Sequence, residues 1–328
     1  MKQLFCLLLL LPLLLTGCSG ASEPVSEDFF AMDTLMRARI WGTRDDLTAA
    51  VQEVNRLDTA LSVTGSGTLA ALNQNGSAVC SDELIALLSE CIRLSRETDG
   101  CFNPTVCALV EAWGFTDGQQ RVPDEKTLRA ALQTVGTAHV QMEAQTVTLD
   151  GGTQLDLGGA AKGYAAQRCA ELLEARGVSC ALLQFGGNVQ TLGKKPDGSD
   201  WTVGIADPDE PTRALALLRF SGSMAVVTSG SYQRYFEQDG VRYHHILDPK
   251  TGYPAQSGLR SVTVLCGNGL TADCYSTALF VMGLERATEF WRRNGGFEAV
   301  FVLEDGTVYA TKGAAVLLSG CEFQVIEP

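Results

Sequence analysis

The segment RYHHILDPKTGYPAQSGLRSVTVL, residues 242–265, decides the fold class of this 328-residue chain. Its two ends, Arg242 to Leu247 and Ser261 to Leu265, are rich in β-branched and aromatic residues, which predicts two strands. Between them lie two prolines and two glycines, which favour a loop. Strands joined in this way, without a crossover helix, are typical of antiparallel sheets.

The sequence on both sides of this segment follows the same pattern. Further strands are predicted from Phe29 to Trp41 and at residues 181–185, 201–205, 214–220 and 224–228, with hairpins near residues 140–149 and 299–310. Apolar residues at three- and four-residue steps predict helices at residues 44–61, 81–100, after 124, and at 160–176, 271–282 and 285–293. The prediction is an α+β fold of mainly antiparallel sheets with packed helices. Without a Pro/Ser-rich linker, one compact unit is favoured over two lobes.

The N-terminal residues are predicted to be a targeting segment. Residues 1–17 carry one charge, Lys2, and a leucine-rich run that is too short for a membrane-spanning helix, so they are interpreted as a signal peptide. The run ends in Leu-Thr-Gly-Cys, which predicts a lipoprotein with its lipid on Cys18; ordinary secretion is the alternative. Residues 18–28 are polar and predict a flexible tether, and residues 29–326 the folded domain. The domain is therefore expected to be exported and lipid-anchored, on the extracytoplasmic side of a bacterial membrane.

The net charge argues against a nucleic-acid partner. The whole chain carries a formal charge of −13, which becomes −14 when the segment containing Lys2 is removed. An anionic ligand of so acidic a protein needs a metal ion, backbone amides or a placed lysine.

The cysteines do not predict a disulfide framework. Removing Cys6 and lipidating Cys18 leaves nine of the eleven, and these lie in apolar segments. We expect buried thiols, with Cys101 and Cys107 as a conceivable pair, and no Cys-x-x-Cys zinc site is present.

The first candidate site motif is DLGGAAKGY, residues 156–164. Asp156 is predicted to end a strand, and Gly158-Gly159 would let a ligand approach the backbone just before a helix. The helix start offers amides and a positive dipole to phosphate, and Lys162 reaches the same anion. A plain strand-to-helix turn would have the same glycines.

The second motif is TADCYST, residues 271–277. Asp273 and Thr277 stand four residues apart on a predicted helix, so the carboxylate and hydroxyl can share one oxygen-loving cation. Oxygen ligands without His or Cys suit Mg²⁺ better than zinc. An acid in the first helical turn and a threonine bonded to its own helix would give the same spacing.

Adjacent histidines precede the third motif, HILDPKTGYP, residues 245–254. Neighbours on a strand face opposite sides, so one of His244 and His245 should face a site. The ordinary pKa of imidazole suits deprotonation of a hydroxyl, which makes His245 the candidate general base; Asp248 is the competing candidate.

These three motifs, in their types, order and spacing, resemble the ApbE family of FAD:protein FMN transferases. The resemblance implies that Asp156 and Lys162 contact FAD and that Mg²⁺ binds the Gly159 carbonyl and the side chains of Asp273 and Thr277. Matches recur from Met32 to Gly283, including GGN at residues 186–188 and WTVGIADP at residues 201–208.

Further segments resemble FAD contacts of the family. These are TSG at residues 228–230, MDT at 32–34, TDGCFNPT at 98–105 and the start of the third motif, which adds Met32, Cys101, Phe102, Asn103, Thr228, Ser229, Gly230, His245 and Ile246 to the expected FAD site. Three positions depart from the family pattern: Asp33 replaces a glycine, Asn103 an aspartate, and Thr64 an aromatic residue expected against the flavin.

The resemblance implies an enzyme that moves the FMN half of FAD onto a threonine or serine hydroxyl of another exported or membrane protein and releases AMP. The expected acceptor is a membrane electron-transfer subunit. Two alternatives remain open at this point: an FAD pyrophosphatase that releases free FMN and AMP, and a non-enzymatic FAD-binding lipoprotein.

Overall fold

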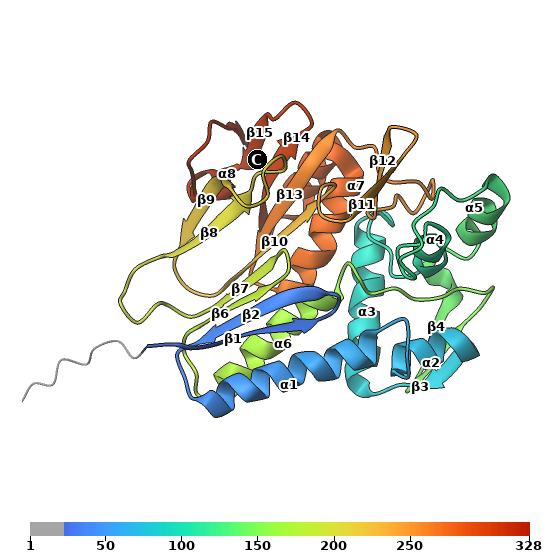
Figure 1. Ribbon diagram of the computed structural model, residues 1–328, viewed down its shortest axis with the longest axis horizontal. Helices are drawn as coiled ribbons and strands as arrows, with labels where there is room; N and C mark the ends of the chain where they lie inside the picture. The colour runs from blue at the N-terminus through green and yellow to red at the C-terminus, as the bar shows by residue number, and fades with distance from the viewer. Residues whose placement is uncertain (1–22) are drawn as a thin grey trace, which may run out of the picture.

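A nine-stranded sheet forms the centre of the computed structural model, which describes residues 23–328 (Figure 1). The strands, in spatial order, are β1 (Val25–Ala31), β2 (Thr34–Ile40), β6 (Ala181–Phe185), β7 (Asn188–Leu192), β10 (Met224–Gly230), β13 (Leu259–Cys266), β14 (Phe297–Leu303), β15 (Val308–Thr311) and β17 (Gln324–Ile326). All neighbours pair antiparallel except β15 and β17. The predicted α+β class with mainly antiparallel sheets is confirmed.

Both faces of this sheet are covered, except for the outer face of β1 and β2, where Phe30 and Leu35 are exposed. The helices α1 (Arg44–Leu61), α6 (Ala161–Ala175), α7 (Gly269–Asn294) and, packed on α7, α3 (Asp82–Glu97) lie on one face. The small sheet of β8 (Trp201–Ala206), β9 (Ala214–Phe220) and β16 (Leu318–Ser319), with α8 (Lys312–Ala315), lies on the other. Along β13, Val262 and Val264 belong to the helix-side core and Leu265 to the opposite core, as strand alternation requires.

Two smaller groups of elements complete the chain. One holds α2 (Thr68–Asn75), β3 (Ser77–Val79), the 3₁₀ turn η1 (Thr137–His139), β4 (Val140–Glu143) and β5 (Thr146–Leu149). The other packs α4 (Cys107–Ala112), α5 (Glu125–Leu132), β11 (Tyr235–Gln238) and β12 (Val241–His244) around the buried Trp113. The indole N–H of Trp113 donates to the Gly252 carbonyl at 2.7 Å, which ties this group to the loop after β12.

The N-terminal strand predicted from Phe29 to Trp41 is instead a hairpin. Its two turn residues, Met32 and Asp33, have φ values of 48° and 57°, as a two-residue turn with a left-handed backbone requires. Aspartate tolerates this region better than most residues, which accounts for Asp33 in place of the family's glycine. The apolar pattern continues through the turn, so it gives no sign of the reversal.

The expected tether, residues 18–28, overlaps the first strand. Val25 to Asp28 pair with Arg37 to Ile40, and the Arg37 guanidinium donates to the Asp28 carboxylate at 2.5 Å. Polar residues fit an edge strand because the backbone of β2 supplies the pairing. The signal peptide and Cys18 lie outside the described residues, and residues 23–328 contain no helix with the length and hydropathy of a membrane span.

Two other sequence predictions can be compared with the structure. The helices expected at 271–282 and 285–293 form one element, α7, interrupted at Gly283, whose φ of 76° breaks the helical backbone. The nine cysteines that the structure describes are all free thiols and seven of them are buried, so Cys101 and Cys107 form no disulfide.

Helix α1 begins with a capping box. The Thr43 hydroxyl accepts from the Asp46 N–H, and the Asp46 carboxylate accepts from the Thr43 N–H at 2.9 Å. The Thr43 hydroxyl and N–H and the Arg176 guanidinium lower the pKa of Asp46 to about 2. Figure 1 shows α1 running alongside the β1–β2 hairpin, so this cap fixes the helix that supports it.

Thr43→Ala removes this cap and should lower the free energy of unfolding by about 1 kcal/mol in urea denaturation. Thr48→Ala, in the same helix, is the control and should change stability by less than about 0.5 kcal/mol, because the exposed Thr48 hydroxyl only bonds back to the Arg44 carbonyl. Equal losses in the two variants would show that the cap contributes nothing of its own.

Candidate functional site

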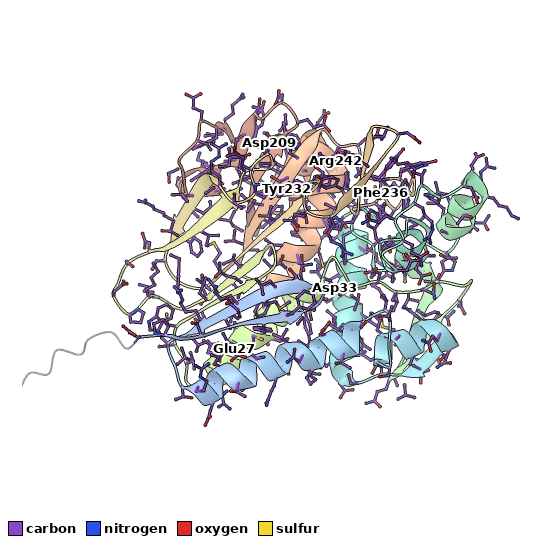
Figure 2. All side chains as sticks on the ribbon, viewed as in Figure 1. Glu27, Asp33, Asp209, Tyr232, Phe236 and Arg242 are labelled. Carbon is purple, nitrogen blue, oxygen red and sulfur yellow. The ribbon has the colours of Figure 1, made fainter. Side chains whose placement is uncertain are left out.

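A cavity of about 690 Å³ opens where the β1–β2 turn, the β6–β7 turn, the end of β10 and the starts of α6 and α7 converge. This volume suits a nucleotide-sized ligand. Figure 2 shows Asp33, which lines the cavity, at the tip of the β1–β2 hairpin. Thirteen of the predicted site residues in the described part of the chain line the cavity: Met32, Cys101, Phe102, Asn103, Asp156, Gly159, Lys162, Thr228, Ser229, His245, Ile246, Asp273 and Thr277.

Asp156 lies in an extended segment and not at the end of a strand as predicted. Its N–H donates to the Pro104 carbonyl at 2.8 Å, outside any sheet. Its carboxylate accepts from the Gly158 N–H at 2.6 Å, and burial raises its pKa against the opposing effects of this bond and of the charges on Arg234 and Lys162. Residues remote in sequence hold this segment in place, so the alternation that predicts strands could not show that Asp156 lies outside a sheet.

Lys162 lies in the first turn of α6, as predicted. Its ammonium donates to the Gly158 carbonyl at 3.1 Å. The N-cap residue of α6, Ala160, makes no side-chain cap, so the positive end of the helix is left for other partners. Lysine and helix start therefore form one anion-binding corner.

The starts of α6 and α7 touch at Gly163. The Asp273 carboxylate accepts from the Gly163 N–H at 2.8 Å. A methyl group on Gly163 would lie 2.2 Å from the Gly269 carbonyl oxygen and 2.6 Å from Cβ of Asp273. Only glycine allows this approach, so one contact brings both candidate site motifs together.

Thr277 lies one turn after Asp273 and close to Gly159. A Cβ on Gly159 would be 3.2 Å from the Thr277 hydroxyl, and the Ser229 hydroxyl lies 3.5 Å from it. Ser229 also bonds the Ser276 hydroxyl at 2.8 Å. The three residues predicted as metal ligands, Gly159, Asp273 and Thr277, are thus brought to one wall of the cavity.

These residues fit a hard cation. Asp273 is only 3% exposed, and within residues 23–328 it has no lysine, arginine or histidine partner, only the Gly163 N–H. A buried carboxylate without a countercharge is costly unless a cation joins it. The described residues contain no cluster of three His, Cys, Asp or Glu side chains, which agrees with a set of one carboxylate, one hydroxyl and one carbonyl.

The adjacent histidines face opposite sides, as predicted. His244 is buried, with Nε2 at 3.1 Å from the Ala255 carbonyl, whereas His245 lines the cavity. Nδ1 of His245 lies 3.1 Å from the Arg234 carbonyl, an acceptor, so Nδ1 carries the proton and Nε2 keeps its lone pair. Burial, with the charges on Arg234 and Lys162, lowers the pKa of His245 to about 3. The ordinary imidazole pKa on which the sequence prediction rested therefore does not hold at this site.

Asp248, the competing candidate base, does not line the cavity. Its carboxylate accepts from the Lys250 N–H at 2.8 Å and its carbonyl from the N–H groups of Thr251 and Gly252, so it shapes the loop. The sequence pattern could not separate the two roles, because Asp-Pro turns and catalytic aspartates look alike.

One other predicted position, Gly230, differs from the expected arrangement. Gly230 does not line the cavity; a Cβ there would lie 2.5 Å from the Tyr232 ring, so glycine makes room for that side chain. Thr64 is exposed and lies outside the cavity lining. Asn103 keeps an acceptor, since its Oδ1 accepts from the N–H and hydroxyl of Thr105 at 3.0 and 2.7 Å.

Sequence reasoning missed several lining residues. Arg234 adds a cation beside His245. Phe115 and Tyr232 add aromatic rings to the cavity lining, whereas Thr64 lies outside it and has no ring. The Arg234 guanidinium donates to the Phe115 carbonyl at 3.1 Å. Tyr232 and Arg234 follow directly after the TSG motif, which was the available signal, whereas Phe115 carried none.

The fold and cavity define an α+β protein with a nucleotide-sized site, in which Lys162 and the start of α6 form an anion-binding corner and Asp273 fits a hard cation. The ApbE family model matches residues 32–301. An FAD:protein FMN transferase of Treponema pallidum is 37% identical over 325 residues, covering 90% of each chain, and one of Klebsiella pneumoniae is 36% identical over 238 residues, covering 71% of this chain and 73% of that one.

Solved structures agree with this result. The ApbE protein of Thermotoga maritima superposes with a TM-score of 0.84 at 32% identity, over 90% of this chain and 99% of that chain. The flavin transferase ApbE of Vibrio cholerae gives a TM-score of 0.79 at 28% identity, over 90% and 99%. The chain belongs to the ApbE family.

Gly163→Ala should separate α6 from α7 and lower the free energy of unfolding by about 1–3 kcal/mol, with weaker FAD binding measured by fluorescence titration. Gly267→Ala is the matched control, since a Cβ there meets nothing within 4 Å, and it should leave both quantities unchanged. Unaltered FAD affinity in Gly163→Ala would show that the helix contact does not organise the site.

Proposed function

We propose that this protein transfers the FMN moiety of FAD to a threonine or serine hydroxyl of another protein, with Mg²⁺, and releases AMP. Family membership supports flavin transfer, because the relatives carry the name FAD:protein FMN transferase. The observation that carries the proposal is the buried Asp273 beside Thr277 and Gly159, in a cavity that also holds the His245 imidazole. Simple flavin binding has less need of a cation site.

The chain's own groups place the pyrophosphate. Lys162 and the uncapped start of α6 attract its negative charge, and the glycines at 158 and 159 allow its approach to the backbone. The Gly159 carbonyl, Asp273 and Thr277 would hold Mg²⁺, which when bound neutralises charge on the phosphates. Arg234 adds a second cation on the His245 side.

His245 would take the proton from the incoming hydroxyl. Its Nε2 is the free base of a ring held by the Arg234 carbonyl. The acceptor oxygen forms a bond to the FMN phosphorus, the pyrophosphate bond to AMP breaks, and the hydroxyl proton leaves through His245. Water in place of the hydroxyl would give free FMN and AMP, so exclusion of water decides between transferase and pyrophosphatase.

The N-terminal sequence supports a proposed location for the reaction. The leucine-rich run and Cys18 support an exported domain held to a bacterial membrane by a lipid. The acceptor would then be an exported or membrane protein, such as a membrane electron-transfer subunit. Palmitate labelling of the wild-type chain and of Cys18→Ala in a bacterial host tests this, with label expected only in the wild type.

Asp273→Ala should abolish Mg²⁺-dependent AMP release and flavin attachment to an acceptor domain, because it removes the only carboxylate of the proposed cation site. Asp273→Asn keeps an oxygen acceptor for the Gly163 N–H and should be equally inactive while retaining the circular dichroism spectrum of the wild type. Mg²⁺-dependent transfer by either variant would remove Asp273 from the cation site.

His245→Asn should lower kcat by about 10²–10⁴-fold with little change in FAD affinity. Because the pKa of His245 lies well below 6.5, the base form predominates above about pH 3, and kcat/KM for FAD should not fall between about pH 8 and about pH 5. Stopped assays of AMP release check both points. An acidic limb near pH 6.5 in the wild type that persists in His245→Asn would assign the proton to another group.

A further inference from the structure

Two large apolar side chains lie exposed beside the cavity, on the β1–β2 hairpin. Phe30 is 70% exposed and Leu35 is 66% exposed, and the two residues are direct cross-strand partners. The hairpin turn between them, Met32 and Asp33, lines the cavity, as does Thr34. An exposed apolar pair at this place calls for a partner that covers it.

Strand alternation places this pair on the face of the hairpin away from the helices. Phe29 packs edge-on against Phe185 at 6.0 Å, and Met36 is fully buried in the helix-side core. Their neighbours Phe30 and Leu35 therefore point to the opposite face. The pair does not contribute to the core, so these two apolar side chains are available to bind a partner.

We propose that the outer face of the β1–β2 hairpin, defined by Phe30, Leu35, Arg37 and Arg39, is the docking surface for the acceptor protein. The occupant is an extended polypeptide segment that lays an apolar side chain on Phe30 and Leu35 and brings its hydroxyl past the hairpin turn into the cavity. This inference rests on the proposed function, which requires a protein to reach that opening.

The shape of the surface suits an extended segment. Strand β1 is the terminal strand of the central sheet, and among residues 23–328 no strand pairs with its other side. An edge strand offers backbone groups to an added strand, while side chains of alternate residues supply specificity. Phe30 and Leu35 lie within two residues of the turn residues that line the cavity, so a bound segment that contacts the pair can reach the cavity.

Charge complementarity favours an acidic segment. Arg37 is paired with Asp28, but Arg39 has no ion-pair partner within the described range 23–328. This face therefore carries one uncompensated positive charge, at the end of the hairpin remote from its turn, on a chain of net charge −13. Electrostatic attraction of this kind mainly raises the association rate and falls with salt. An acidic residue at the end of the bound segment remote from the acceptor hydroxyl would be attracted to Arg39.

The course of the chain argues for a protein acceptor rather than the membrane. The described chain enters β1 at its far end, and Phe30 lies five residues after Val25, about 17 Å along the strand. A lipid anchor preceding residue 23 would attach at that far end, while the apolar pair lies beside the cavity opening. The position of the pair therefore matches the route of the acceptor.

The test is acceptor kinetics with a double variant. Phe30→Thr with Leu35→Thr preserves strand-forming residues and should raise KM for an acceptor domain at least about tenfold, while FAD affinity and acceptor-independent AMP release stay at wild-type values. Val316→Thr is the matched control: Val316 is 80% exposed, follows α8 and does not line the cavity, so its KM should not change.

A photo-crosslinking residue at position 30 should give a one-to-one adduct with the acceptor domain, and the same residue at position 316 should not. An unchanged KM in the double variant, with transfer by the wild type intact, overturns the docking surface and leaves the proposed function standing. Loss of FAD binding in the double variant also overturns the docking surface. So does a double variant that binds lipid vesicles less well than the wild type but keeps the wild-type KM for the acceptor, since the apolar pair would then contact the membrane. Failure of the wild type to modify any acceptor would instead overturn the proposed function.

Discussion

The hydrogen bond from the Gly163 N–H to the Asp273 carboxylate is the constraint on which the site depends. It joins the first turn of α6 to the second turn of α7, through two residues that lie 110 positions apart in the sequence. Without a side chain at Gly163 the helices approach closely enough for Lys162, Gly159 and Thr277 to share one wall. The same bond leaves Asp273 buried with one oxygen uncommitted, the feature on which the proposed cation site rests.

The central sheet makes this contact possible because both of its faces are covered, except on the outer side of the β1–β2 hairpin. Helices α6 and α7 pack on one face, and the small sheet of β8, β9 and β16 packs on the other, so the strand ends are held rigidly. Polar groups gather where the strands and helices end, since backbone donors and acceptors there lack regular partners. The nucleotide cavity and the turn of the exposed hairpin both lie where these strands and helices end.

Much of the fold and of the candidate site could be predicted from the sequence. Helical periodicity and caps identified α1, α3 and α6, and short motifs identified Asp156, Lys162, Asp273 and His245, because each signal is local. The reversal at Met32 and Asp33 was not predicted, since it depends on two left-handed residues within a continuous apolar pattern. Arg234 and Phe115 reach the cavity only through tertiary packing. Asp248 lies outside the cavity lining because its carboxylate and carbonyl bond to the backbone of its own loop, and residue spacing does not reveal those bonds.

The most direct measurement combines two quantities: the mass of an exported acceptor domain that bears a threonine for modification, and the AMP released. Both are measured after the acceptor domain is incubated with this protein, FAD and Mg²⁺. The account predicts that the acceptor gains the mass of FMN less one water, in step with AMP and only when the hydroxyl is present. AMP and free FMN at the same rate with or without the acceptor, or FAD bound without any AMP, would contradict it.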